Sequence, residues 1–299
     1  MIPFTKAHAC GNDFLIVNRA DVGNCDLADL TRRLCERYTG IGADGVEYFQ
    51  RLSDTSAKIH LRNADGSVAE ISGNGTRCVA AWMAEEINAE PGESFSLETD
   101  AGPRTCTIKE FRDSDDGPTI LIATDMGEPE FEDRTVELSD GTRVEGVYVS
   151  MGNPHFVILL PRADLAAVGG ESSLDAGERA LASLDFSMDG RSWDDVGEEI
   201  CQHPDFPDQT NVEFVHVLAG ESEPIERIAI RIYERGVGPT SSSGTGTSAA
   251  ATAMIGIYEA RHEIEVFAPG GAQSVTWAGP GTALLLTGPA TLVARGEVW

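Results

Sequence analysis

The sequence predicts a mixed α/β (α+β) fold made of two pseudo-equivalent halves, on three observations. Short segments in which aliphatic and β-branched residues dominate, such as residues 228–232, are typical of strands. Glycine-rich turns and a few helical windows separate them. Several motifs recur in the same order along the chain, which indicates duplication of one structural unit.

Four helices are expected from the local patterns. They cover residues 26–38, 76–88, 174–184 and 247–259. The second and the fourth are rich in alanine and follow glycine turns, so each is predicted to be entered from a strand through a tight turn.

The clearest repeat is a glycine turn followed by a helix. Residues 72–76 (SGNGT) match residues 243–247 (SGTGT) at an offset of 171 residues. The same offset places Ile59 and Leu61 on Ile230 and Ile232, so a strand precedes the turn in both copies. Two more pairs keep the same order, namely residues 11–14 with 152–156 and residues 45–47 with 211–213. We place the boundary between the halves near residues 125–129 and expect functional residues to face each other there.

The charge balance excludes two classes of partner. The chain has 22 Lys plus Arg against 49 Asp plus Glu, a formal net charge of −27. Such a field repels nucleic-acid phosphates and anionic lipid surfaces, so neither nucleic acid nor membrane is expected as a partner. Both a salt-adapted source and a biased genome would explain this composition. The three lysines, Lys6, Lys58 and Lys109, lie in no evident pyridoxal site.

Targeting segments and metal motifs are absent from the sequence pattern. The first residues lack a basic segment followed by an apolar one, and no window has 18 apolar residues, so a cytoplasmic protein is expected. The six cysteines form no CxxC pair, which predicts reduced and mostly buried thiols and no metal site. They are Cys10, Cys25, Cys35, Cys78, Cys106 and Cys201.

The repeated glycine turn predicts an anion receptor. A strand that runs through S-G-x-G-T into a helix presents free backbone N–H groups with no bulky side chain in the way. Two such turns would hold the carboxylate of a small molecule. A glycine turn without a ligand is the alternative, but its recurrence at a fixed offset favours the receptor.

Polar residues near the matched motifs suit a zwitterionic amino-acid ligand. Glu234 and Arg235 stand side by side at the end of an apolar strand, where they would bind an ammonium and a carboxylate; an exposed ion pair is the alternative. Four amides are further candidates, although each also suits a turn. They are Asn12, Asn63, Asn153 and Asn211.

Seven segments together resemble the diaminopimelate epimerase family, within the wider proline racemase-like superfamily. They occur in the family's order over nearly the whole chain. The segments are residues 8–14 (HACGNDF), 38–45 (YTGIGADG), 63–67 (NADGS), 73–78 (GNGTRC), 151–155 (MGNPH), 210–214 (TNVEF) and 233–238 (YERGVG).

The resemblance implies two similar domains, each a sheet wrapped around a central helix. The first would comprise residues 1–125 with a returning strand at about 288–299, and the second residues 126–287. Family members are cofactor-independent, use no metal, and are usually homodimers. They are isomerases that invert a stereocentre of an amino acid in lysine and cell-wall biosynthesis.

The resemblance also implies a site. In the family one cysteine thiolate removes the α-proton while a thiol on the opposite face returns one. The catalytic positions correspond to Ser72 and Ser243. Substrate would be bound by Asn12, Asn63, Asn153, Asn211, Glu234 and Arg235, with Gly73, Asn74, Gly244 and Thr245 around its reacting carboxylate.

The chain departs from the family at these catalytic positions, where serines replace both cysteines. An alcohol ionises several pH units above a thiol, and a gap of roughly four or five units adds on the order of 6 kcal/mol to proton abstraction. His60 and His155 are the nearest candidate bases for the serines. Gly45 and Pro239 stand where the family often has Gln and Glu, which affects the distal substrate contacts.

Three hypotheses therefore stand at the level of sequence. The chain is an epimerase of diaminopimelate or a related amino acid that uses a serine pair, or a related isomerase or dehydratase with a non-thiol base. The third is an amino-acid binder without activity, or a chain whose cysteines were changed to trap a ligand.

Overall fold

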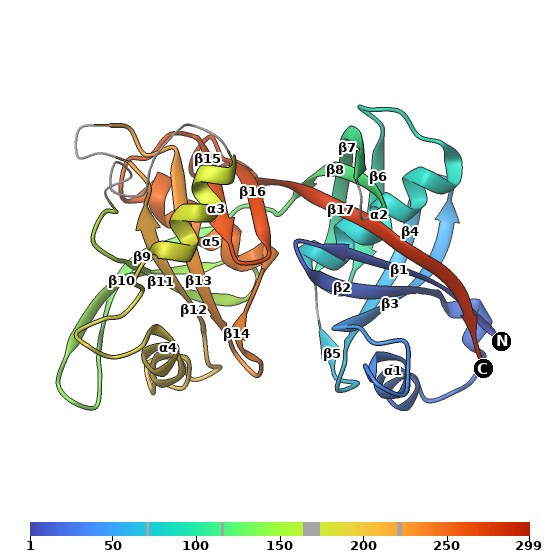
Figure 1. The fold of residues 1–299 in the computed structure, drawn as a ribbon, viewed down its shortest axis with the longest axis horizontal. Helices are drawn as coiled ribbons and strands as arrows, with labels where there is room; N and C mark the ends of the chain where they lie inside the picture. Colours follow the sequence, from blue (N-terminus) through green and yellow to red (C-terminus); the bar gives the residue numbers. More distant parts are fainter. Residues whose placement is uncertain (70–71, 115–116, 164–173, 220–222) are drawn as a thin grey trace. The chain divides into compact units, whose positions relative to one another are not determined.

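Two compact units make up the chain. The structure, a computed structural model, describes residues 1–69, 72–114, 117–163, 174–219 and 223–299. One unit comprises Met1–Asp125 with Thr287–Trp299, and the other Met126–Leu286 (Figure 1). Each unit has its own helix surrounded by strands.

The first unit has three helical segments and nine strands among its described residues. The helical segments are η1 (Arg19–Val22), α1 (Leu27–Cys35) and α2 (Gly73–Ile87). The strands are β1 (Ile2–Ala9), β2 (Asn12–Asn18), β3 (Gly45–Ser53), β4 (Ser56–Asn63), β5 (Val68–Ala69), β6 (Ser94–Thr99), β7 (Gly102–Ser114), β8 (Gly117–Asp125) and β17 (Leu285–Val298).

Eight of these strands close into a ring. The order β1-β2-β3-β4-β6-β7-β8-β17 returns to β1, with β2–β3 and β4–β6 parallel. The last strand brings the end of the chain back to its start, since Ile2 pairs with Val298 and His8 with Thr291. A return strand at about 288–299 was expected, and the strand runs over Leu285–Val298.

Helix α2 fills this ring. Eleven of its fifteen residues are buried, and it contacts β1, β2, β6, β7 and β8. Small residues such as Ala80, Ala81 and Ala84 let the strands approach it from several sides, as is typical of a helix buried in a core. It ends at Asn88 in the left-handed conformation, a common helix stop.

The second unit has three helices and eight strands in the part of the chain that is described. The helices are α3 (Leu174–Ser183), α4 (Trp193–Cys201) and α5 (Gly244–Gly256). The strands are β9 (Glu130–Glu137), β10 (Arg143–Ser150), β11 (Pro154–Leu159), β12 (Asn211–Val217), β13 (Arg227–Glu234), β14 (Gly238–Thr240), β15 (Glu263–Ala268) and β16 (Gly271–Thr276).

The strand pairing of the second unit repeats that of the first. β11–β12 and β13–β15 are parallel, as are β2–β3 and β4–β6, and β5 and β14 each add a short strand beside the sheet. Helix α5 contacts β9 to β13, β15 and β16, and twelve of its thirteen residues are buried. The duplication seen in the motifs is thus also present in the order of elements.

The remaining helices lie outside these central helices. α1 packs on β3, where Leu30 and Leu34 join a small apolar cluster, and α4 packs on β12 and β13 through Val196 and Ile200. The sequence predicted α1 and α3 but not α4. Among the described residues, no helix is long and apolar enough to cross a membrane.

The two central helices begin three residues before their predicted starts. Helices were expected from Thr76 and Thr247, whereas α2 begins at Gly73 and α5 at Gly244. The glycines that suggested a turn are themselves helical. They form the first turn because the serine before each of them supplies the cap.

Candidate functional site

Ser72 and Ser243 cap the two central helices in the same way. The Oγ of Ser72 accepts a hydrogen bond from the Gly75 N–H at 3.1 Å, and the Oγ of Ser243 accepts one from the Gly246 N–H at 3.2 Å. Both serines are extended, with φ of −128° and −141°. The two predicted catalytic positions are therefore local equivalents at the positive ends of helix dipoles.

A buried carboxyl group explains the second glycine of each turn. A Cβ added at Gly75 would lie 2.1 Å from Oε1 of Glu47, and one added at Gly246 would lie 2.7 Å from Oε1 of Glu213. Both distances are too short for a side chain. The internal repeat of the sequence aligned Glu47 with Glu213 but assigned neither a function. A charged residue inside an otherwise apolar strand was the signal that could have identified them.

The strand registers place both glutamates identically. Glu47 pairs with Leu61 across β3–β4, and Glu213 pairs with Ile232 across β12–β13. Glu47 is 1% exposed and Glu213 is fully buried. Burial raises the pKa of Glu47 to about 8, and it also raises the pKa of Glu213, against an opposing effect of His155.

His155 is held between two predicted site features. Its Nδ1 lies 2.8 Å from Oε1 of Glu213, and its Nε2 lies 3.1 Å from Oδ1 of Asn153. Ser243 instead bonds Gly246 and Thr245 through its hydroxyl. His60 forms an exposed pair with Asp100. In the described part of the chain, neither His60 nor His155 thus forms a hydrogen bond with Ser72 or Ser243.

Two predicted residues of the first unit, Asn12 and Asn74, meet in one hydrogen-bonded chain. The Asn74 amide donates to Oδ1 of Asn12 at 3.2 Å, and the Asn12 amide donates to Asp44 at 2.7 Å. The fully buried Arg77 donates to Oδ1 of Asn74. Asn74 follows Gly73, so this chain fixes the side chains around the start of α2.

Asn63 lies apart from that chain. It is exposed at the end of β4, and its amide donates to the Ser67 hydroxyl at 3.1 Å. Its backbone N–H donates to the Ser67 carbonyl, which closes a turn. In this structure Asn63 therefore forms a turn, the alternative that the sequence had left open.

The predicted residues of the second unit form two short contacts. The Asn153 amide donates to Oγ1 of Thr245 at 3.4 Å, next to Gly244. Oδ1 of the buried Asn211 accepts from the Arg235 backbone N–H at 3.0 Å. Each contact joins a predicted amide to a predicted carboxylate-binding or substrate-binding residue.

Glu234 and Arg235 lie where β13 ends. Glu234 is partly buried and pairs with Gly238 across β13–β14. The Arg235 side chain is exposed, and its Nη1 donates to the Asp208 carbonyl at 2.9 Å. Its guanidinium is thus held by a neutral acceptor, which leaves its positive charge uncompensated by that contact.

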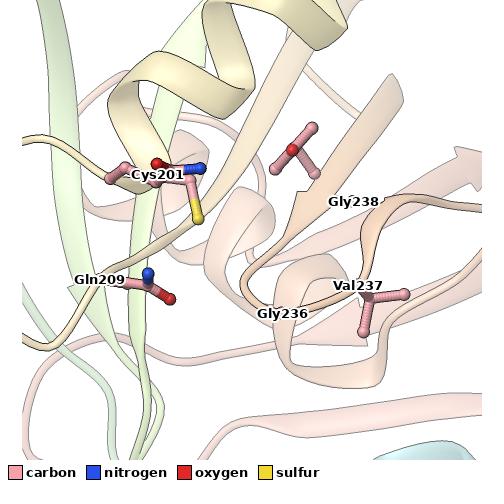
Figure 2. Close-up of a pocket in the computed structure, with 7 residues that line it drawn as sticks. Cys201, Gln209, Gly236, Val237 and Gly238 are labelled. Carbon is pink, nitrogen blue, oxygen red and sulfur yellow. The ribbon is translucent and has the colours of Figure 1, made fainter.

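A pocket of 250 Å³ flanks the turn after Arg235 (Figure 2). It is lined by Cys201, Gln202, Gln209, Tyr233, Gly236, Val237 and Gly238. All of these side chains are uncharged, and none of these residues is among the predicted substrate-binding residues. Within the described ranges, no group of three or more His, Cys, Asp or Glu residues could hold a metal ion.

Solved structures of similar fold include a predicted epimerase and a phenazine biosynthesis protein. A predicted epimerase from Pseudomonas aeruginosa matches with a TM-score of 0.66 at 14% identity, covering 100% of this chain and 99% of that one. A phenazine biosynthesis protein of the PhzF family from Bacillus anthracis matches with a TM-score of 0.64 at 17% identity, covering 100% and 99%. At such low identity these likenesses show the fold, a closed barrel around a helix.

The comparisons of sequence identify one family. The family model described as diaminopimelate epimerase matches residues 4–132 and 147–293. The diaminopimelate epimerase of Xanthomonas axonopodis pv. citri is 32% identical over 309 residues, covering 98% of this chain and 95% of that relative. That of Carboxydothermus hydrogenoformans is 30% identical, covering 98% of each. The chain belongs to the diaminopimelate epimerase family, and the family places it among the amino-acid epimerases, a class of isomerase.

Proposed function

We propose that the chain is a cofactor-independent epimerase that inverts the α-carbon of diaminopimelate or a closely related amino acid. The single observation that supports this proposal most is the serine-capped helix start. It is present twice, each time with a buried glutamate, Glu47 or Glu213, against its first turn. An inversion by two groups needs one such start for each face of the α-carbon.

In this proposal Ser72 and Ser243 act at the α-proton, one on each face. The first-turn N–H groups of α2 and α5, at Gly73, Asn74, Gly244 and Thr245, stabilise the charge that builds up on the α-carboxylate. Arg235 and Glu234 bind the substrate's charged groups, with Asn12, Asn63, Asn153 and Asn211 as polar contacts. A homodimer without metal or organic cofactor is part of the same proposal.

The test is incubation with L,L-diaminopimelate in deuterium oxide, in the presence of a chelator and without pyridoxal phosphate. The α-proton signal in the NMR spectrum should decay with the enzyme and not with a boiled control, and the meso isomer should accumulate. Tight binding by calorimetry without any loss of that signal would mean an amino-acid binder and would contradict the proposal.

A related isomerase or dehydratase that moves the proton with a group other than the serine pair is the second candidate. The contact between the buried Glu213 and His155 favours it, because this pair could move a proton without either serine. Loss of water or a shift of a double bond, seen in the same NMR spectra, would distinguish it from epimerisation.

A further inference from the structure

Two buried carboxyl groups, those of Glu47 and Glu213, lie against the first helical turns that the serines cap. The carboxyl of Glu47 occupies the space that a side chain at Gly75 would fill, and the carboxyl of Glu213 does the same at Gly246. A side chain at either glycine would therefore have to displace the carboxyl group.

Each serine borders the same space as its carboxyl group. The Cβ of Ser72 lies 3.3 Å from the position that a Cβ at Gly75 would take. In the second unit the Cβ and Oγ of Ser243 lie 3.2 Å and 3.4 Å from the corresponding position at Gly246. In the described residues the serine hydroxyls bond the helix starts rather than the carboxyl groups, and catalytic contacts are often longer in free enzymes than in the substrate complex.

The two carboxyl groups differ in their partners. Both oxygens of Glu47 lack a hydrogen-bond partner among the described residues, whereas Oε1 of Glu213 contacts His155. The two carboxyl groups have different partners because one position of the repeat, Phe14 in the first unit and His155 in the second, differs in side chain. Phe14 pairs with Gly45 as His155 pairs with Asn211, so the first unit has a phenyl ring where the second has an imidazole.

The surroundings of Glu47 favour its neutral form. Its neighbours across the strands are Ile16 and Leu61. The titratable groups facing it are the Cys78 thiol of α2 and Asp100 after β6, and Asp100 opposes a second negative charge. Arg77, the buried cation of α2, bonds Asn74 instead. Glu47 therefore holds its proton at neutral pH, with a pKa of about 8.

We propose that Glu47 is the proton donor behind Ser72, and that Glu213 with His155 is the proton acceptor behind Ser243. This inference rests on the proposed function. It makes the two halves chemically unequal, as an inversion in one direction requires: one face needs a base and the other needs an acid.

The proton transfers balance without any further reactant. On one face the Cα–H bond breaks, its proton goes to Oγ of Ser243, and the hydroxyl proton of Ser243 passes to Glu213. On the other face the hydroxyl proton of Ser72 forms the new Cα–H bond, and the proton of Glu47 replaces it. The negative charge has then moved from Glu213 to Glu47, and before the next turnover Glu213 releases its proton to water while Glu47 takes one up.

A variant that keeps shape but not proton transfer separates this role from a structural one. Glu47→Gln fills the same space, so it should leave substrate affinity within threefold of the parent. Its rate of inversion at pH 7.5 should fall about 100-fold, within the usual range for a general acid. The parent's kcat/KM in that direction should decline above pH 8, and this limb should vanish in Glu47→Gln. Glu98→Gln, an exposed residue of β6, is the matched control and should behave as the parent. A loss of less than tenfold in Glu47→Gln would overturn the proposal.

A second measurement decides the inference even if the parent shows no turnover, an outcome that would contradict the proposed function alone. In Ser72→Cys, alkylation of the new thiol by iodoacetamide is followed by peptide mass spectrometry against pH, with and without Glu47→Gln. An ionised Glu47 close to position 72 would oppose a thiolate there. Removing the carboxyl should therefore lower the pH midpoint of alkylation by about one unit. An unchanged midpoint would show that Glu47 does not act on position 72 and would overturn the inference.

Discussion

Nδ1 of His155 lies 2.8 Å from Oε1 of Glu213, and neither side chain has exposed surface. The equivalent position of the first unit is Phe14, and the Glu47 carboxyl of that unit has no hydrogen-bond partner among the described residues. The two halves thus bury the same carboxyl group in two different environments.

Removing His155 should destabilise the protein mainly at high pH. His155→Phe leaves the Glu213 carboxyl buried without its partner, which costs about 3 kcal/mol when that group is ionised. At pH 5 the loss should be smaller, since the raised pKa of Glu213 favours its neutral form. Urea unfolding at pH 5 and pH 8 measures both values. His155→Phe combined with Glu213→Gln should recover most of the loss at pH 8; no recovery would mean that the effect is one of packing.

Alanine at the second glycine of either turn should destabilise the protein. In an ordinary helix Gly→Ala is stabilising by up to about 1 kcal/mol. Gly75→Ala instead brings a Cβ to 2.1 Å from Glu47, so we expect a loss of about 3 kcal/mol. Thermal unfolding measures the change, and Gly75→Ala with Glu47→Ala should regain part of it. A stabilising Gly75→Ala would show that the carboxyl does not occupy this space.

The stability of the protein should depend on pH through Glu47. A carboxyl whose pKa rises from 4.5 to about 8 on folding binds its proton more tightly in the folded state. This stabilisation is fully present below pH 4.5 and is lost as pH rises through 8. Relative to Glu47→Gln, the parent should lose about 1.4 kcal/mol per pH unit between pH 5 and 8. Denaturation at constant salt tests this, and parallel curves for the two proteins would refute the burial of an isolated carboxyl.

Arg235 should contribute to binding of the amino acid. Its side chain is exposed and is held by the Asp208 carbonyl, so its charge is available to a carboxylate. Arg235→Met should weaken binding by about 2 kcal/mol, roughly 30-fold, because a charge-assisted hydrogen bond is lost. Calorimetry measures the affinity. Arg261→Met, which removes an exposed arginine paired with Glu226, is the control. If both variants bind the amino acid with the same affinity, Arg235 does not contact the ligand.

The repeats in the sequence predicted much of this architecture. The offset between the serine turns predicted two equivalent helix starts, and the structure has Ser72 and Ser243 as caps with matching geometry. The starts of α2 and α5 were predicted three residues too late, because the glycines were assigned to a turn before the helix and not to its first turn. Helix α4 was missed because its nine residues include Gly197, whose place is required by the Tyr233 side chain packed against it. Such a tertiary contact leaves no local pattern.

The glutamates show where sequence reasoning about the site ended. Glu47 and Glu213 were aligned as members of a repeat, but their proximity to Gly75 and Gly246 depends on strand register and helix packing. Asn63 was grouped with the other amides, and in the structure it also closes a turn with Ser67. Which amides contact the helix starts is set by tertiary structure, as the bond between Asn74 and Asn12 illustrates.

The central claim is that Ser72 and Ser243 stand where two-base inversion takes place, and restoring thiols at both positions tests it most directly. A helix N-terminus lowers the pKa of a thiol to a useful range but leaves an alcohol far from ionised. The double variant Ser72→Cys/Ser243→Cys should therefore exchange the α-proton of L,L-diaminopimelate in deuterium oxide, and invert it, at least 100-fold faster than the parent. Each single variant should gain much less, because inversion needs both faces. A double variant that folds, binds the amino acid and exchanges no more deuterium than the parent would contradict the account.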